Sequence, residues 1–319
     1  MNSNLFFEVI HNVTIPEQML SGLIVGGAYV TGFVSETTSE VVPSIANKNC
    51  RPPSMPLPTY WSPSLILTPN QEILLCGGKH HGNTCMEMKQ NNWEIHSKLN
   101  EERNYAASVS MPNGVFIFGG TGSDGLEPKN SWEWLPRNTK VWRKGGFLAS
   151  VGFSQGCAVK ASDNEIVLIG GMYSKKTVVR YIDFNLMVHL DNILKVGRWG
   201  HSCVSFNDKI IVSGGYNSDG YLRSVEVLEY IGYRLLTFKL SSSFIEAKAY
   251  HGLLVAPIQN KLSVLALGGY DNITGHDREL DSIEILDPTT YTWTLSNMKL
   301  SRPNQQFGYA TVPTHLVCS

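Results

Sequence analysis

Short apolar runs separated by polar stretches dominate the chain, and six of these runs end in a Gly-Gly doublet. Each run is short and rich in Ile, Val, Leu and Phe, a pattern typical of a buried β-strand. Two glycines at the end of a strand permit a backbone with positive φ and a close approach of neighbouring backbone. The six runs are LIVGG (23–27), ILLCGG (73–78), VFIFGG (115–120), IVLIGG (166–171), IIVSGG (210–215) and SVLALGG (263–269).

The doublets recur at a nearly regular interval, which indicates an internal repeat. Their first glycines stand at positions 26, 77, 119, 170, 214 and 268, so that 42 to 54 residues separate them. A polar loop follows each doublet, and then further strand-like runs complete the unit. Examples are SVEVLEY (224–230) and DSIEILDP (281–288), the Trp-containing runs WEIHSKL (93–99), VWRKGGF (141–147) and YTWTLSNM (291–298), and the runs HSCVSF (201–206) and YHGLLVAP (250–257) that precede the next doublet.

These features together resemble kelch repeats, which have a period of about 50 residues. The resemblance rests on the doublets, the run SIEILDP, the Trp of YTW and the Arg-x-x-His of residues 198–201, and it covers roughly residues 22–313. The resemblance implies an all-β fold with four antiparallel strands in each unit. Trp93, Trp142 and Trp293 are expected in the core between units, since a large aromatic side chain contributes most when it is buried.

One four-stranded unit cannot bury both faces of its sheet, whereas six units arranged radially can. The chain starts with a second strand that lacks its first strand, and QFGYATVP (306–313) is a first strand that lacks its second. Pairing of the two would complete one blade from both termini. We therefore expect a closed six-bladed β-propeller over 22–313, with an N-terminal arm (1–21) and a C-terminal tail (314–319) outside the repeat.

Composition and charge exclude several partner classes. The net charge is −1, so bulk electrostatics give no reason to bind nucleic acid or an anionic membrane. The longest apolar runs are too short for a membrane span. The N-terminal sequence MNSNLFFEVIHN has no basic region and therefore does not look like a signal peptide. We expect a monomer that uses no cofactor.

The stretch EILLCGGKHHGNTC (72–85) places Cys76 and Cys85 on either side of His80 and His81. A zinc site would need convergent ligands, and adjacent histidines in an extended loop point in different directions, so no metal is expected. Both cysteines face each other across a predicted hairpin, and we expect either a disulfide or two buried thiols.

The cysteine pattern also resembles a group of invertebrate kelch propellers that stand alone, without BTB or BACK segments. The resemblance covers NCRPPSMPLP, LLCGG, NTC, QGCAV and GHSCV. It favours a Cys76–Cys85 disulfide and an extracellular location, with the cytoplasm as the alternative because a signal peptide is not evident. Cys157 and Cys203 hold comparable places in adjacent units, where they either pair or pack.

Loops that enter each first strand share one propeller face with the loops that follow the doublets. Basic and aromatic residues recur there and suggest a surface for an acidic peptide or a carboxylate. The alternative is that Arg-x-x-His braces the blade edges. The predicted partner-binding residues are Arg103, Tyr105, Arg198, Trp199, Tyr250, His251 and Arg302, with Lys248 at a comparable offset.

Catalytic motifs are absent from the sequence, and no catalytic residue is predicted. GHDRELD (275–281) offers ionisable side chains for a sugar-type acid–base enzyme, but a solvated loop explains it equally. The expected function is a non-catalytic propeller that binds a protein or peptide through one loop-rich face. The alternatives are a small-molecule (sugar-type) enzyme with its site at the channel mouth, and a structural module without a discrete site.

Overall fold

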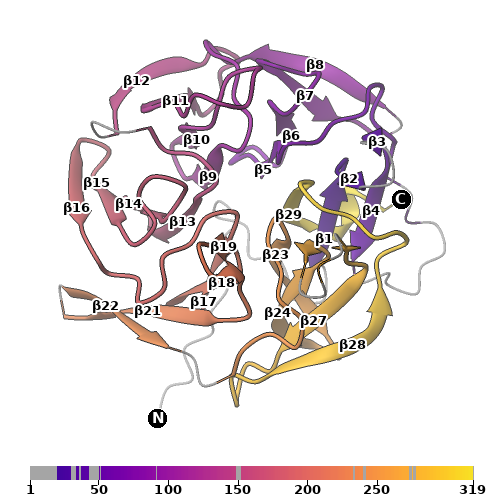
Figure 1. Cartoon of the computed structure of the whole chain (residues 1–319). Helices are drawn as coiled ribbons and strands as arrows, with labels where there is room; N and C mark the ends of the chain where they lie inside the picture. Colours follow the sequence, from indigo (N-terminus) through magenta and orange to yellow (C-terminus); the bar gives the residue numbers. More distant parts are fainter. Residues whose placement is uncertain are drawn as a thin grey trace.

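Antiparallel strands form six sheets arranged radially around a central channel (Figure 1). The computed structural model describes residues 20–29, 34–35, 37–42, 50, 52–90, 92–148, 152–232, 234–239, 242–272, 275 and 278–318. Five sheets have four strands, and the sixth has three strands within these residues. The expected closed, six-bladed β-propeller with antiparallel blades is therefore confirmed.

Each blade runs from an inner strand at the channel to an outer strand at the rim. The first three blades consist of the following strands: blade 1, β29 (Gly308–Pro313), β1 (Leu20–Val25) and β4 (Ser39–Val42); blade 2, β5 (Ser64–Leu67), β6 (Ile73–Cys76), β7 (Thr84–Met88) and β8 (Trp93–Lys98); blade 3, β9 (Ala107–Met111), β10 (Gly114–Phe118), β11 (Ser131–Pro136) and β12 (Arg143–Phe147).

The other three blades follow the same plan, and three of the loops after doublets form small hairpins. The strands are: blade 4, β13 (Cys157–Ser162), β14 (Glu165–Ile169), β15 (Val178–Ile182) and β16 (Leu186–Leu190); blade 5, β17 (Ser202–Phe206), β18 (Lys209–Ser213), β21 (Val225–Ile231) and β22 (Arg234–Lys239); blade 6, β23 (Gly252–Ile258), β24 (Lys261–Leu267), β27 (Ser282–Leu286) and β28 (Trp293–Lys299); hairpins, β2 (Ala28–Tyr29) with β3 (Val34–Ser35), β19 (Tyr216–Asn217) with β20 (Gly220–Tyr221), and β25 (Tyr270–Asp271) with β26 (Arg278–Glu279).

The two ends of the chain close the ring. Strand β1 pairs with β29 from Leu20 opposite Pro313 to Val25 opposite Gly308, as the sequence predicts. The strand begins two residues before the predicted boundary at 22, and the predicted tail contains a 3₁₀ helix, η2 (Thr314–Leu316). The rest of the predicted N-terminal arm, residues 1–19, lies outside the described residues.

The Gly-Gly doublets are where neighbouring blades come closest. All twelve glycines have φ between +55° and +113°. At Gly214, an added Cβ would lie 2.4 Å from the carbonyl oxygen of Lys248, and the N–H of Gly215 donates to the same oxygen at 2.8 Å. Each doublet therefore joins its blade to the connector that enters the next blade, and a side chain there would force the two apart.

Hydrophobic side chains fill the six junctions between adjacent blades, with one large cluster at each junction. Trp93, Trp142 and Trp293 lie in these clusters, with 6%, 4% and 3% of their surface exposed. Their expected place in the core between blades is therefore confirmed. Among the described residues, no helix is long and apolar enough to cross a bilayer.

All six cysteines stand in pairs at disulfide-bonding distance. Cys76 lies directly opposite Cys85 on β6 and β7, which matches the predicted pair. Cys157 and Cys203 join the inner strands of blades 4 and 5, so the alternative of pairing holds over simple packing. A third pair, Cys50–Cys318, links the segment after β4 to the C-terminal tail.

Candidate binding face

We call the end of the propeller that carries the doublet loops the mouth face. Six residues, each two positions before an inner strand, form a ring at its centre and have φ between +47° and +61°. Five of their backbone N–H groups donate to the carbonyl of the neighbouring member, for example from Tyr250 to Gly200 and from Gly200 to Gln155, both at 2.7 Å. The N–H of Tyr105 donates to the carbonyl of Trp61, next to Ser62, at 3.0 Å. This mouth ring consists of Ser62, Tyr105, Gln155, Gly200, Tyr250 and Gln306.

Two tyrosines of the mouth ring close the channel on this face. Tyr105 and Tyr250 enter from opposite blades, and their ring centroids lie 6.2 Å apart. The hydroxyl of Tyr250 donates to Gln155 at 2.8 Å, and that of Tyr105 donates to Gln306 at 3.3 Å. Burial is the main cause that raises the pKa of both hydroxyls, so both stay protonated donors. The two side chains and their glutamine partners thus form a fixed plug.

A cavity of about 160 Å³ lies between the plug and the inner strands. Small side chains line it, including Ser108, Ala158 and Ser202, together with Tyr309. The neighbouring His201 and His251 are buried, at 6% and 2% exposed. Burial, followed by the charge of Arg198, lowers the pKa of His201 to about 3, so this side chain is neutral at physiological pH.

Aromatic side chains extend from the plug across the mouth face. On one side, Tyr105 stacks with Trp61 at 6.0 Å, and Trp61 contacts Tyr60 at 5.5 Å. On the other side, Tyr216 and Tyr221 lie near enough to Tyr250 to contribute to its raised pKa. All eight rings are partly exposed. We call them the aromatic run: Tyr60, Trp61, Tyr105, Tyr250, Tyr216, Tyr221, Trp199 and Tyr270.

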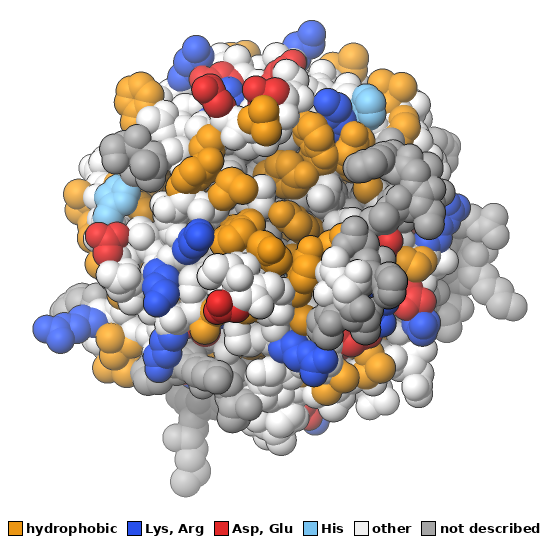
Figure 2. Space-filling model, viewed as in Figure 1, with side chains coloured by type: hydrophobic (Ala, Val, Ile, Leu, Met, Phe, Trp, Pro, Cys, Tyr) orange, Lys and Arg blue, Asp and Glu red, His pale blue; other side chains and the backbone are white. Residues whose placement is uncertain are grey.

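The second half of the aromatic run is held together by edge contacts. Trp199 meets Tyr216 at 5.1 Å, Tyr216 meets Tyr221 at 4.9 Å, and Tyr221 meets Tyr270 at 5.3 Å. Figure 2 shows hydrophobic side chains gathered over the centre of this face, with charged side chains mostly farther out. The hairpins after the doublets of blades 5 and 6 supply three of these tyrosines.

Two lysines lie over the tryptophans of the aromatic run. The ammonium of Lys79 is 4.4 Å from the ring centroid of Trp61, and that of Lys175 is 4.6 Å from Trp199. Trp61 precedes blade 2 and Trp199 precedes blade 5, and these blades stand opposite each other in the ring. Both ammonium groups therefore flank the plug from opposite sides at a distance suited to a cation–π contact.

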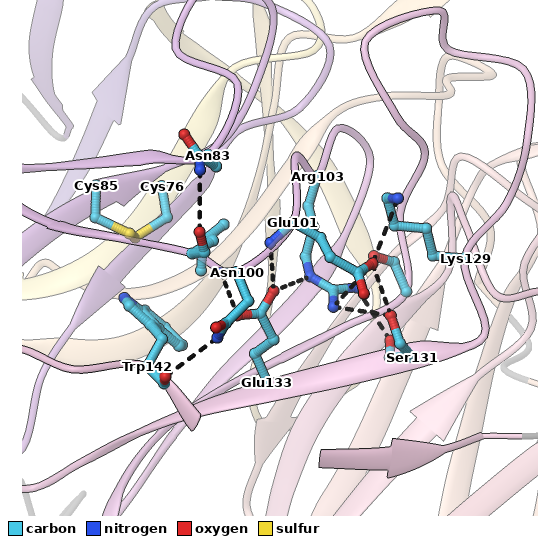
Figure 3. A network of polar contacts seen from close by, with 12 residues as sticks. Cys76, Asn83, Cys85, Asn100, Glu101, Arg103, Lys129, Ser131, Glu133 and Trp142 are labelled. Atoms are coloured by element: carbon cyan, nitrogen blue, oxygen red, sulfur yellow. Dashed lines mark hydrogen bonds and ion pairs between the residues drawn. A yellow bond between two sulfur atoms is a disulfide. The ribbon is translucent and has the colours of Figure 1, made fainter. Parts of the chain in front are cut away.

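The predicted arginines lie elsewhere, inside the connectors between blades. Arg103 is 2% exposed, and its Nε donates to Glu133 at 2.9 Å while Nη1 donates to the carbonyl of Gly119 at 2.7 Å (Figure 3). Glu133 also accepts the N–H of Asn100 at 2.6 Å. Each donor is used within the fold, so Arg103 holds the connector from blade 2 to blade 3 and leaves no group for a partner.

The same brace recurs in blades 5 and 6. Arg198 pairs with Glu226 at 2.7 Å, and Lys248 pairs with Glu284 at 3.0 Å, with all four side chains fully buried. Burial lowers the pKa of Arg198, and Glu226 opposes that shift. The prediction that Arg103 and Arg198 contact a partner is therefore corrected. The bracing role that the sequence left as the alternative accounts for these residues.

The remaining predicted residues divide between the surface and the interior. Tyr105, Trp199 and Tyr250 belong to the aromatic run. His251 is buried, and its Nε2 lies 3.0 Å from the hydroxyl of Ser213, so the prediction of a partner contact is corrected here too. Arg302 is exposed but does not hold the register of Arg103. That place belongs to Asn304, which donates to the carbonyl of Gly26 at 2.9 Å.

The carboxylates of the braces and five rings of the aromatic run are not among the residues predicted from the sequence. A signal for the carboxylates exists, because the third strand repeats Ser-x-Glu at 131–133, 224–226 and 282–284. The serine of this pattern accepts a hydrogen bond from the guanidinium of the same brace. Ser131 accepts from Arg103 at 2.9 Å, and Ser224 accepts from Arg198 at 3.1 Å. Tyr60, Trp61, Tyr216, Tyr221 and Tyr270 stand at differing offsets in variable loops, where no period marks them.

Metal-binding potential within the described residues is limited to one group. Ligand atoms of Glu72, Glu87 and His96 lie within 4.8 Å of one another in blade 2, away from the mouth ring. The ammonium of Lys89 already contacts Glu87. In GHDRELD, His276 and Asp277 lie outside the described residues, and Arg278 pairs with Asp271 at 2.7 Å.

Comparison with known proteins supports the fold. A profile of the kelch motif matches residues 198–231 and 263–296. No curated protein matches the chain. The solved structure of YjhT aligns with a TM-score of 0.66 at 16% identity, and the alignment covers 79% of this chain and 87% of that one. The chain is a six-bladed β-propeller that carries kelch motifs.

Proposed function

We propose that this propeller is a non-catalytic module that binds a protein or peptide segment through its mouth face. The aromatic run carries the proposal, because it places two sets of four contacting, partly exposed rings on one face. Tyr250 of the first set lies near Tyr216 and Tyr221 of the second. Large, stiff aromatic side chains with a polar atom are the residues on which protein interfaces depend most.

The closed mouth favours a flat partner over a small molecule held in the channel. The plug of Tyr105 and Tyr250 is fixed by two side-chain hydrogen bonds, at 3.3 Å and 2.8 Å. The cavity below it is about 160 Å³. Pockets for drug-sized ligands usually measure about 300–1,000 Å³. The buried ion pairs brace connectors rather than face this cavity, so none of them serves as an acid–base pair for a ligand.

Pairing of every cysteine supports a role in an oxidising compartment. Disulfides persist outside the cell and are reduced in the cytosol. Peptide mapping of protein from its native source, under non-reducing conditions, would test this part of the proposal. Free thiols at all six positions would contradict it.

Binding is tested with a random peptide library displayed on phage and selected on the immobilised chain. We expect enriched peptides that lose affinity for Trp61→Ala and Trp199→Ala, since each substitution removes a large ring from the proposed contact surface. Truncation of a central Trp hot spot typically weakens binding by more than about tenfold, whereas most other contact residues cost little.

Ile231→Ala is the matched control. Ile231 is a large apolar residue with 55% of its surface exposed, but it stands at the end of β21 farthest from the mouth face. Its loss should leave binding unchanged. Equal binding by all three variants would place the contact elsewhere, and the absence of any enriched peptide would contradict a peptide-binding face.

A further inference from the structure

We propose that blade 2 binds a divalent transition-metal ion such as Zn²⁺ between the side chains of Glu72, Glu87 and His96. One ligand atom from each side chain lies within 4.8 Å of the other two. Glu72 directly precedes β6, Glu87 lies on β7 and His96 lies on β8, so the ion would join three neighbouring strands of the blade. The site lies away from the mouth face and does not depend on the proposed peptide binding.

The strand register places both carboxylates on one face of the blade. Glu87 pairs directly with Leu74 of β6, and Glu72 stands two residues before Leu74. Side chains two residues apart in an extended chain point to the same side of a sheet. Glu87 is only 6% exposed, and among the described residues its carboxylate contacts one partner, the ammonium of Lys89. A carboxylate offers about four acceptor sites, so this buried group retains capacity for a cation.

A β-bulge turns the imidazole of His96 toward the two carboxylates. Ser97 pairs with Cys85 and Ile95 pairs with Met86, so His96 is the extra residue between them. His96 is 7% exposed, and within the described part of the chain only its Nδ1 has a hydrogen-bond partner, the hydroxyl of Ser97 at 2.8 Å. A buried imidazole that keeps an unpartnered nitrogen and stands beside two carboxylates has the chemistry of a metal ligand.

Outer hydrogen bonds hold two of the three side chains in place. The hydroxyl of Thr68, which is 2% exposed, donates to the carboxylate of Glu72 at 3.2 Å. The Ser97 hydroxyl that bonds to His96 also accepts from the indole N–H of Trp142 at 3.0 Å. Metal-binding histidines and carboxylates usually have such partners, which fix the orientation of the ligand.

The kinds of ligand atom select the metal. One imidazole nitrogen and two carboxylate oxygens suit Zn²⁺, which binds them at about 2.0–2.2 Å in a tetrahedron with a water at the fourth position. Ligand atoms in that geometry stand about 3.4 Å apart, and small rotations of the carboxylates reach this distance from within 4.8 Å. Ca²⁺ takes about six to eight oxygen ligands, more than this group offers.

Lys89 supplies the cation that competes for the site. Its ammonium contacts Glu87, and its side chain is 44% exposed, so it can move into solvent when an ion binds. Entry of the ion therefore exchanges one weak, partly exposed ion pair for direct ligation. Removal of the Lys89 charge should favour the metal, whereas removal of a ligand should disfavour it.

Isothermal titration of the chelator-treated chain with zinc sulfate tests the site. The wild type should bind one ion at this site. Glu87→Gln and His96→Gln should each weaken binding by more than about tenfold, because even the loss of an outer partner of a ligand costs about 10–100-fold. Lys89→Gln should strengthen binding about two- to fivefold, as expected when a partly exposed ion pair no longer competes. Equal affinities across these four proteins, or no binding by the wild type, would overturn the inference.

His189→Gln controls for zinc that binds exposed histidines. His189 is exposed on β16, in blade 4, and should not affect the affinity. A loss equal to that of His96→Gln would show an adventitious ion only and overturn the inference. Zinc-edge X-ray absorption of the loaded wild type needs no variant. It should show nitrogen and oxygen ligands at about 2.0–2.2 Å, and sulfur ligands at about 2.3 Å would refute the assignment.

Discussion

The cysteine pair Cys50–Cys318 spans the point where the ring closes. Cys50 follows β4 and Cys318 follows β29, so both ends of blade 1 are joined covalently outside its strand pairing. The strands alone hold this closure through the pairing of β1 with β29. We therefore expect Cys50→Ala/Cys318→Ala to destabilise the propeller more than removal of either other pair.

The magnitude follows from the size of the loop that each bridge closes. The three pairs have sequence separations of 268, 46 and 9 residues. The loop-entropy relation then gives about 5.5 kcal/mol for Cys50–Cys318, about 4 kcal/mol for Cys157–Cys203 and about 2.5 kcal/mol for Cys76–Cys85. The free energy of unfolding should therefore fall most for the first pair and least for the last.

Guanidinium unfolding of the three double alanine variants would measure these losses. Cys76 and Cys85 are 1% and 0% exposed, so their truncation also leaves a cavity, whereas Cys50 and Cys318 are only partly buried. The cavity cost therefore acts against the expected order. Unfolding of the wild type and the variants after reduction of all cysteines measures that cavity cost separately. If the loss corrected for it were no larger for Cys50/Cys318 than for Cys76/Cys85, ring closure would not depend on this bridge.

Three other predictions concern the interior. Burial lowers the pKa of His201 from 6.5 to about 3, so the unfolded chain binds this proton before the folded chain does as the pH falls. The contribution of neutral His201 to the free energy of unfolding is therefore complete above about pH 6.5 and declines between pH 6.5 and 3. Thermal unfolding measures how much free energy of unfolding each protein loses between pH 7 and pH 4.5. This loss should be smaller by about 2–3 kcal/mol in His201→Gln than in the wild type, and an equal loss in both proteins would refute the assignment. Glu226→Gln leaves the buried Arg198 without a counter-ion and should cost about 3–5 kcal/mol in urea unfolding, while a loss below about 1 kcal/mol would contradict the brace. Gly214→Ala should cost at least about 2 kcal/mol more than Gly232→Ala, because Gly232 has a similar φ of +60° but nothing within 4 Å of its added Cβ; similar losses would show that φ alone matters.

The braces and the aromatic run depend differently on the sequence. Each brace joins residues about 30 positions apart, such as Arg103 and Glu133, and repeats with the blade, so a periodic signal exists for it. The aromatic run joins residues from Tyr60 to Tyr270, which meet only because the ring brings blades 2, 3, 5 and 6 to one mouth. Its conformation also has a local cost, since Tyr105 and Tyr250 both have φ of +54°. All six residues of the mouth ring share this positive φ, so the surrounding structure enforces it at every blade.

The sequence by itself determined the number of blades, the buried strands, the closure by both termini and the core positions of the tryptophans. These features follow from a hydrophobic pattern that repeats with each doublet, and burial of apolar faces acts in the same way at every repeat. Only the tertiary structure decided which charged and aromatic side chains reach solvent. From the sequence, Arg103 resembles an exposed loop residue. In the folded chain, its guanidinium donates to Glu133 and to the carbonyl of Gly119 and is buried. Loop side chains have no period, and their neighbours are fixed only when the six blades close around the channel.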